Sequence, residues 1–320
     1  MKTEMMFTTG VSLGTMQELE VMLVGSANID LVIRTPRFPA PGETLQGSDF
    51  QTFAGGKGAN QAVAIGKIGG NCGLIAKVGS DGFGKQLIES LRTNNVHINN
   101  VLQVSTESTG VAVITVDAQG QNTILVAQGT NGLLAPEEVR QGLSHASFKV
   151  LLVQLEIPME AVMEASKFAS GRIFILNPAP AQELSDELLS RVDYLTPNET
   201  EAHLLTGILP VDSKSCDQAA AVILAKGVKN VLFTLGSMGS YLANASGGRL
   251  FPAIRVTPID TTAAGDAFNG AFAHYLASGE TVDRSIRLAN IAGALCTTKP
   301  GAQASMPSLA EILLHDQQAL

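Results

Sequence analysis

The sequence predicts an α/β fold in which helices flank a doubly wound, mostly parallel sheet, together with a small β-sheet lid. Two observations carry this prediction. First, short apolar runs typical of buried strands alternate with helical patterns through short links over 172–235, as βαβ units do. Second, residues 109–115 and 122–127 are expected to form a hairpin, which does not belong in a parallel succession of strands and helices. Together with strands expected around 36–53, this hairpin would form the lid.

We expect a single domain over residues 18–320, with the lid inserted at about 34–53 and 107–128. The chain has 320 residues, 45% of them hydrophobic, which is enough for a large core. Neither an internal repeat nor a low-complexity linker divides it. Residues 1–17 are expected to be a disordered leader, because they lack the basic segment and apolar segment of a signal peptide.

Composition argues against several classes of partner. The net charge is -8, and the 21 Lys and Arg residues form no basic run, so neither nucleic acid nor a membrane surface is expected to bind. No apolar stretch approaches 18 residues, which excludes a transmembrane helix. The three cysteines have no close pair and are expected to be core residues in a reducing compartment, which predicts a cytoplasmic protein. The five histidines show no zinc-ligand spacing.

Polar side chains follow the first predicted strand. The apolar run 21–24 ends at a glycine, and Asn28 and Asp30 come shortly after it. In open parallel sheets, ligands bind at this edge, and a spacing of two in extended chain points both side chains the same way. A carboxylate and an amide can bind adjacent sugar hydroxyls. By itself the pair is weak evidence for such a site.

A glycine-rich loop and a later strand end offer further polar groups. Residues 54–58 run into a helical pattern, and a glycine loop there would let Lys57 and Asn60 approach a ligand. A plain turn does not account for both side chains. The apolar run 149–155 delivers Glu156 to the end of another strand. Residues 79–85 match the start of a Walker A loop, but glutamine follows where the Mg²⁺-binding Ser or Thr would stand, so we interpret them as an ordinary turn.

The stretch 258–270 contains the strongest catalytic signal. Small residues at 263–265 begin a helix, whose first N–H groups have no internal partner and can bind a phosphate or an oxyanion. Asp266 would repel that anion unless it accepts a proton from an attacking hydroxyl, as the aspartate of protein kinases does. The alternative is that Asp266 only stabilises a first helical turn. Similarly, Asp260 either caps the following turn or, lacking an evident cationic partner, binds a cation.

Two more strand ends are candidates. Asn198 and Glu201 lie three residues apart at a helix start, where they would form a capping box, organise phosphate-bound Mg²⁺ through water, or do both. Thr234 and the glycines Gly236 and Gly239 follow a strand and offer a hydroxyl and closely approaching backbone.

Four motifs together resemble the PfkB family of sugar kinases over about 21–305: Asn28-x-Asp30, the residues 41–44, 55–62 and 260–266. The resemblance implies that ATP phosphorylates D-ribose at its 5-hydroxyl, with Mg²⁺ and a K⁺ activator. Another PfkB substrate, such as 2-deoxyribose, fructose or a nucleoside, is the alternative within enzymes. A sugar-binding protein that has lost catalysis is the alternative outside them, and the retained Asp266 argues against it.

The resemblance also implies roles for individual residues. In it Asp266 is the base, and Ala263, Ala264 and Gly265 form the anion hole. The sugar would be held by Asn28, Asp30, Gly56, Lys57, Asn60, Glu156 and Asp266.

Nucleotide and metal sites follow in the same way, with Glu201 as an indirect Mg²⁺ ligand. ATP would contact Asn198, Thr234, Gly236, Gly239, Gly265 and Asn290. The K⁺ site would comprise Asp260, Thr262, Cys296, Lys299, Gly301 and Ser305, of which Thr262 and Lys299 depart from the residues common in the family.

The lid predicts a homodimer. A small projecting sheet has open edges and one apolar face, and a second copy of the chain would cover them. The candidate contacts are Phe50, Val111 and Val113.

Overall fold

The computed structural model describes residues 17–318. Residues 1–16 of the expected leader therefore lie outside the described part, and Gln17 pairs with Ala146 in the short strands β1 (Gln17–Glu18) and β9 (Ala146–Ser147). The main sheet has nine strands. In spatial order they are β15 (Gly247–Phe251), β14 (Ser240–Asn244), β13 (Asn230–Thr234), β12 (Tyr194–Leu195), β11 (Ile173–Leu176), β10 (Val150–Val153), β2 (Val21–Val24), β5 (Cys72–Gly79) and β6 (His97–Val104).

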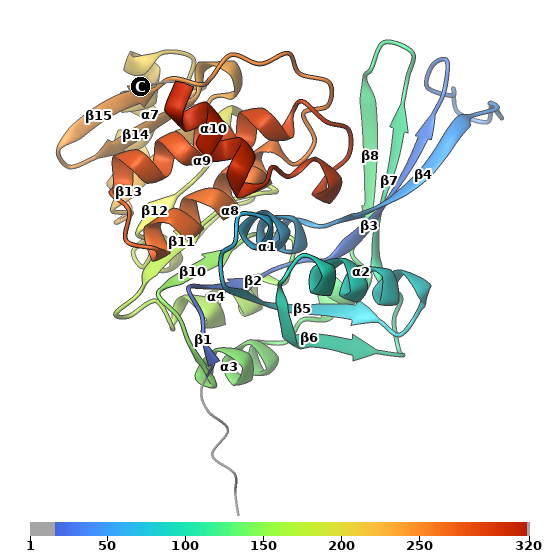
Figure 1. Ribbon diagram of the computed structural model, residues 1–320, viewed down its shortest axis with the longest axis horizontal. Coiled ribbons are helices and arrows are strands. Elements are labelled where there is room, and N and C mark those ends of the chain that lie inside the picture. The colour runs from blue at the N-terminus through green and yellow to red at the C-terminus, as the bar shows by residue number, and fades with distance from the viewer. Residues whose placement is uncertain (1–16, 319–320) are drawn as a thin grey trace, which may run out of the picture.

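Helices cover both faces of this sheet, as the predicted fold class requires (Figure 1). Neighbouring residues of a strand point to opposite faces, so Leu23 joins one core and Val24 the other. The first core is closed by α1 (Lys57–Lys67), α2 (Gly82–Thr93), α8 (Ala264–Ala277), α9 (Val282–Cys296) and α10 (Leu309–Gln318). The second is closed by α3 (Pro136–Ser144), α4 (Met159–Ser166), α5 (Asp186–Leu189), α6 (Glu199–Thr206) and α7 (Ser213–Leu224).

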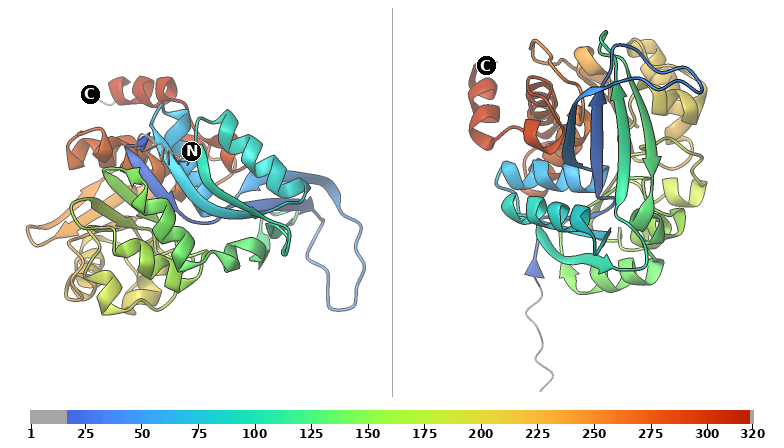
Figure 2. Two further views of the ribbon diagram at one scale, coloured as in Figure 1. Left: turned by 90° about the horizontal axis from the view of Figure 1, so that it is seen from below. Right: turned by 90° about the vertical axis from the view of Figure 1, so that its right-hand side faces the viewer.

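The lid is a separate four-stranded sheet that projects from the core (Figures 1 and 2). Its order is β4 (Ser48–Gly55), β3 (Asn28–Arg34), β7 (Gly110–Val116) and β8 (Asn122–Ala127). The hairpin is present as predicted, with β7 and β8 antiparallel. Sequence reasoning missed β3: the lid begins at Asn28 rather than near residue 34, because the chain passes straight from the core strand β2 into a lid strand.

The strand order reverses beside β2. From β2 the chain goes outward to β5 and β6, and then returns to form β10, β11, β12 and β13 on the other side. Strands β2 and β10 are parallel neighbours, so their carboxyl ends mark the switch point where α/β folds bind ligands. The chain that leaves these two ends carries Ser26 and Glu156.

Other parts of the chain were not foreseen. Strands β14 and β15 add an antiparallel edge to the sheet, beyond the parallel strands that the alternating pattern indicated. The Walker-like turn is a helix cap: Asp81 accepts a hydrogen bond of 2.8 Å from the Gly84 N–H, and another from Thr109 at the foot of the lid. Within residues 17–318 there are also three short 3₁₀ segments: Gly129–Leu133, Gly236–Met238 and Gln303–Ser305.

Candidate active site

The first turn of α8 presents unengaged N–H groups. Ala263 is the N-cap residue and has a left-handed φ of 61°, a strained conformation for a residue with a Cβ. The Ala264 N–H makes a long hydrogen bond of 3.3 Å to the Thr261 carbonyl. Within residues 17–318, no partner is found for the N–H groups of Gly265 and Asp266. These two donors face a cavity and suit an anion.

Asp266 is held by two side-chain amides. The Asn60 amide donates to Asp266 Oδ2 at 2.9 Å, and the Gln61 amide donates to Oδ1 at 3.0 Å. All three side chains are buried. A carboxylate that only stabilises the first turn of a helix does not need both of its oxygens fixed by other side chains. That role therefore does not account for the second hydrogen bond, from Gln61. The geometry therefore favours a carboxylate held for chemistry.

An acidic group of side chains surrounds Lys57. Burial raises the pKa of Asp30 to about 7, and the negative charges of Glu156 and Asp266 add to that shift. Burial by itself would lower the pKa of Lys57. The negative charges of nearby carboxylates, Asp266 and Glu156 first among them, outweigh burial and hold this pKa above its ordinary value. The predicted sugar-binding carboxylates are thus gathered around one ammonium group.

Two contacts at the switch point fix Glu156. The buried Ser26 hydroxyl donates to Glu156 Oε2 at 2.5 Å, and the backbone N–H of Lys57 donates to the same oxygen at 3.1 Å. The Asp30 carboxylate packs directly against Gly55, because a Cβ on this glycine would lie 2.5 Å from Asp30 Oδ2. This part of the site has no space for a larger residue at position 55.

Asn28 is clamped by a residue that sequence reasoning missed. Asn131 lies in the segment after β8 and exchanges hydrogen bonds with the backbone of Ala27, at 2.9 and 3.2 Å. Its amide also donates to Asn28 Oδ1 at 2.6 Å, so the side-chain oxygen of Asn28 is engaged within the protein. Gly110 makes this possible, because a Cβ there would lie 2.3 Å from both groups.

A cavity of about 930 Å³ extends from Lys57 and Asp266 along the start of α8 and the last turns of α9. The predicted nucleotide-binding residues line it, together with apolar side chains such as Ile254 and Val256. From the predicted list these are Asn198, Glu201, Thr234, Gly236, Gly239, Ala263, Ala264, Gly265 and Asn290. Asn28, Asp30 and Glu156 lie outside that lining, so Asp266 stands between a large cavity and a cluster of small polar groups.

Asn198 and Glu201 form the capping box. Asn198 Oδ1 accepts from the Glu201 N–H at 2.8 Å, and Glu201 Oε2 accepts from the Asn198 N–H at 2.9 Å. Glu201 also lines the cavity, and burial raises its pKa above the ordinary value. A buried carboxylate beside Asp266 fits a magnesium ion bound through water, so the two interpretations of this pair are compatible.

Asp260 caps its turn and reaches a distant loop. Its two oxygens accept from the N–H groups of Thr262 and Gly301, each at 2.9 Å. Burial acts to raise the pKa of Asp260, but these hydrogen bonds outweigh it and leave the pKa below its ordinary value. The Cys296 thiol lies 3.0 Å from the Ser305 hydroxyl and 3.7 Å from the Thr262 carbonyl, so the predicted cation-site residues do come together. Lys299 points elsewhere and pairs with Glu311.

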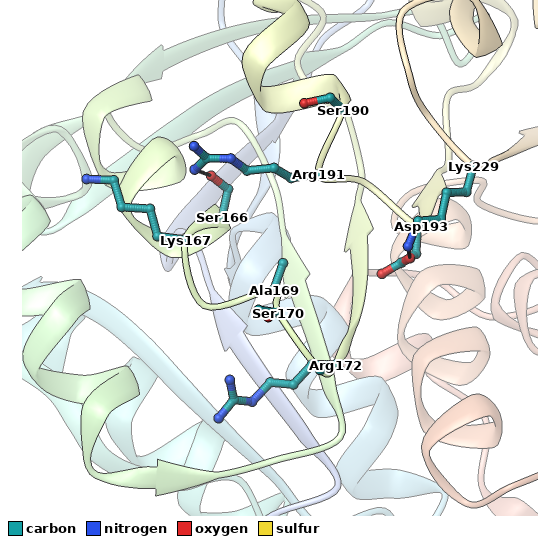
Figure 3. Close-up of a pocket in the computed structure, with 10 residues that line it drawn as sticks. Ser166, Lys167, Ala169, Ser170, Arg172, Ser190, Arg191, Asp193 and Lys229 are labelled. Carbon is teal, nitrogen blue, oxygen red and sulfur yellow. Dashed lines mark hydrogen bonds and ion pairs between the residues drawn. The ribbon is translucent and has the colours of Figure 1, made fainter.

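A second cavity, of about 530 Å³, is lined by residues that lie just before β11, β12 and β13, at the amino ends of these strands (Figure 3). Its lining is basic, but each cation is already engaged within the protein. Lys167 pairs with Glu164, Lys229 with Asp193 and Arg191 with Glu187, while Arg172 lies over the Phe148 ring. The first cavity is therefore the better candidate for substrate binding.

Comparison with known proteins agrees with this geometry. Residues 18–309 match the pfkB family of carbohydrate kinases, and the chain belongs to that family. It is 43% identical over 294 residues to a ribokinase of Haemophilus influenzae, covering 91% of this chain and 96% of the relative. It is also 37% identical to a deoxyribokinase of Salmonella typhi, with 91% and 96% covered. The structure of an Arabidopsis thaliana ribokinase complexed with ribose and ATP superposes with a TM-score of 0.85, at 34% identity and over 93% and 98% of the two chains.

Sequence reasoning found residues of this site that stand in loops, at strand ends and in the first turns of helices, and missed those that support them. Ser26, Gln61, Asn131, Gln154 and Asn177 are buried and polar, and each bonds to another polar group of the site. A signal existed for Gln154, which is a polar residue within the apolar run 149–155. Its partner lies 93 positions away, which no local pattern indicates.

Proposed function

We infer that this protein transfers the γ-phosphoryl group of ATP to the 5-hydroxyl of D-ribose, giving ribose 5-phosphate and ADP. The carrying observation is the Asp266 carboxylate, fixed between a cavity large enough for a nucleotide and the polar cluster under the lid. Family membership and the ribokinase relatives support this assignment.

In this mechanism, Asn28, Asp30, Lys57 and Glu156 hold the sugar hydroxyls, with Asn60 beside them. Asn60 Oδ1 is buried and accepts no hydrogen bond from the described residues, which suits a hydroxyl donor. Asp266 takes the proton of the 5-hydroxyl as the hydroxyl oxygen of the sugar attacks the γ-phosphorus of ATP. The bond between the γ-phosphorus and the bridging oxygen breaks, and that oxygen leaves with ADP. The N–H groups of Gly265 and Asp266 stabilise the transferred charge. Such donors commonly contribute about 3 to 4 kcal/mol each.

Mg²⁺ would be held through water by Glu201 and Asn198 at the cavity wall, where Glu201 is buried close to Asp266. When bound, the ion neutralises negative charge on the phosphate oxygens. On the nucleotide side of the cavity, the Thr234 hydroxyl and the backbone of Gly236 and Gly239 would contact the phosphates of ATP. Removing divalent ions with a chelator should abolish transfer and leave sugar binding by calorimetry in place.

A K⁺ ion would bind beside Asp260, with the Thr262 carbonyl, the Ser305 hydroxyl and the 296–301 loop. The convergence of these oxygen donors supports the site, and the ion would order the loop that leads into the anion hole. Chloride salts of K⁺ and of tetramethylammonium at equal ionic strength test it. Equal kcat/KM values would refute the site; a K⁺ effect that is lost in Asp260→Ala would support it.

Acceptor specificity is tested by coupled ADP release across D-ribose, 2-deoxyribose, fructose and a nucleoside. 2-Deoxyribose is the second candidate, because the deoxyribokinase relative is 37% identical over the same part of the chain. We expect the highest kcat/KM with ribose. Calorimetric ribose binding with no ADP release would instead indicate a sugar-binding protein without catalysis.

A homodimer would form through the lid. Leu125 on the edge strand β8 is 75% exposed and Phe50 is 63% exposed, and a second copy of the chain would cover them. Val111 is a weaker candidate than its sequence position indicated, because it packs against the main core. Light scattering at micromolar concentration should give a dimer mass that Leu125→Glu reduces and the control Leu204→Glu, on α6, does not. A monomer mass for the unaltered chain would refute the dimer.

The protein is also proposed to act in the cytoplasm. Its three cysteines are buried and free, as expected for core residues in a reducing compartment. Across residues 17–318, no helix has both the length and the apolar character needed to cross a membrane. Fractionation of cells that express the protein tests this location.

A further inference from the structure

Gln61 makes three hydrogen bonds while completely buried in the first half of α1. Its amide donates to Asp266 Oδ1 and to Asn177 Oδ1, each at 3.0 Å. Its carbonyl accepts from the Gln154 amide at 2.6 Å. We propose that Gln61 is a positioning residue that sets the orientation of the Asp266 carboxylate, and that Gln154 acts on catalysis only through Gln61. This inference rests on the proposed role of Asp266 as the base.

The reason lies in the geometry of a carboxylate. A single donor leaves the group free to rotate, because one fixed oxygen does not define its plane. Asn60 on Oδ2 and Gln61 on Oδ1 together fix both oxygens and hence the direction of the remaining lone pairs. A general base must lie within hydrogen-bond reach of the proton that it takes, so this direction matters for the rate.

Gln61 can do this because the surrounding fold holds it rigidly. Gln154 follows β10, and Asn177 follows the neighbouring strand β11, so two ends of the main sheet grip one side chain. Glycines permit the close fit. A Cβ on Gly25 would lie 2.0 Å from Gln154 Oε1, and a Cβ on Gly270 would lie 2.6 Å from the backbone carbonyl oxygen of Gln61, where α8 packs against α1.

Several charged or titratable groups also act on Asp266: Lys57 from α1, Asp30 from β3, Glu201 from α6 and Cys296 from α9. Gln61 differs from them because it carries no charge and touches the carboxylate directly. Its removal therefore changes orientation and leaves the balance of charge in the site as it was.

The same buried network also reaches the anion hole. The Asn177 amide donates to the Thr196 carbonyl at 3.2 Å, and the Thr196 hydroxyl donates to Asn269 Oδ1 at 2.6 Å. Asn269 in turn donates to the Gly265 carbonyl at 2.8 Å. One network of buried hydrogen bonds therefore holds both the proposed base, Asp266, and the helix start that carries the phosphoryl-binding N–H groups. Gln61 connects this network to α1.

A double-mutant cycle tests the proposal. The variants are Gln61→Met, Gln154→Met and their combination, because methionine has nearly the same shape and no amide. Tyr241→Phe is the matched control: it removes a partly buried hydrogen bond between β14 and Asp217 of α7, which is not part of the proposed site. For each variant kcat, the KM for ATP and the melting temperature are measured, with whichever sugar the unaltered enzyme phosphorylates best.

We expect Gln61→Met to lower kcat about 10- to 100-fold with an unchanged KM for ATP, and Gln154→Met to lower it about 3- to 10-fold. The double variant should match Gln61→Met alone. The control should change only the melting temperature. A kcat within twofold of normal in folded Gln61→Met would overturn the proposal, as would effects that multiply in the double variant. Should Gln61→Met not fold, Gln154→Met decides: an unchanged kcat there also overturns it. An inactive unaltered enzyme would refute the proposed function instead.

Discussion

Ser26 and Glu156 are joined by a hydrogen bond of 2.5 Å that crosses the switch point between β2 and β10. One residue follows the first core strand and the other follows a strand 130 positions later in the chain. The same Glu156 oxygen accepts the N–H that begins α1, so one carboxylate connects three elements. Its position under the lid depends on a hydroxyl that takes no direct part in the proposed chemistry.

We therefore predict that Ser26→Ala raises the KM for ribose about 3- to 10-fold and leaves the KM for ATP unchanged. A hydrogen bond to a charged group contributes about 1.5 to 3 kcal/mol, and the Lys57 N–H retains part of the hold on Glu156. Steady-state kinetics with each substrate varied checks this. Ser166→Ala, another buried serine, is the control and should alter neither KM. An unchanged ribose KM in Ser26→Ala would remove Glu156 from sugar binding.

Asp266→Asn should lower kcat by about 10² to 10⁴ while ATP still binds. The substitution removes the base, and its new amide would also oppose one of the two donors, Asn60 or Gln61. Loss of that hydrogen bond should reduce the free energy of unfolding by about 1 to 3 kcal/mol. Single-turnover phosphoryl transfer and urea unfolding measure the two effects separately. Activity within a few-fold of normal would exclude Asp266 as the base.

Asp30→Asn should stabilise the free protein at pH 8 and weaken ribose binding. The pKa of Asp30 is raised to about 7, first by burial, so the folded state holds a proton that the unfolded state releases near pH 4. Stability due to this carboxyl is therefore lost as pH rises from about 4 through 7.

Urea unfolding at pH 4 and pH 8 checks this expectation. The variant should match the unaltered protein at pH 4 and exceed it at pH 8 by about 4 kcal/mol. Asp49→Asn, at an exposed lid position, should show the same difference at both values. A gain in the free energy of unfolding that does not depend on pH would show that the pKa of Asp30 is not raised in the folded protein.

Gly265→Ala should separate stability from activity. A Cβ at this position meets no protein atom within 4 Å, and alanine favours a helix over glycine by up to about 1 kcal/mol, so the fold should be retained or stabilised. The methyl group would instead occupy space beside the donors of the anion hole and lower kcat about 10- to 1000-fold. The control is Gly82→Ala in the first turn of α2, which also has open space. Equal kcat values for both variants would place the transferred group elsewhere.

The fold class could be predicted from the sequence because it depends on local patterns. Buried parallel strands are short apolar runs, and the helices between them show their own periodicity. Strand β3 was missed for a related reason: Asn28 and Asp30 were interpreted as polar residues just past the end of a strand, although they lie in the next one. No local sequence pattern indicates that the chain passes from a strand of one sheet into a strand of another.

The site was only partly predictable. Residues such as Lys57 and Asp266 stand in loops and helix starts, where a charged side chain among small residues is conspicuous. The side chains that hold them, such as Gln61 and Asn131, bond to partners more than 100 positions away. Their function depends on tertiary packing, and a single sequence contains no record of those distances.

The connection from β2 into β3 also bears on how this protein could be re-engineered. Asn28 and Asp30 lie at the foot of one lid strand, and Gly55 at the foot of its neighbour, whereas the cavity proposed to bind the nucleotide is lined by strand ends and helices of the core. The lid therefore supplies only part of the proposed sugar site, because Lys57, Asn60 and Glu156 belong to the core. An exchange of residues 28–55 between relatives would therefore change the contribution of the lid to sugar binding and leave the lining of the large cavity unaltered.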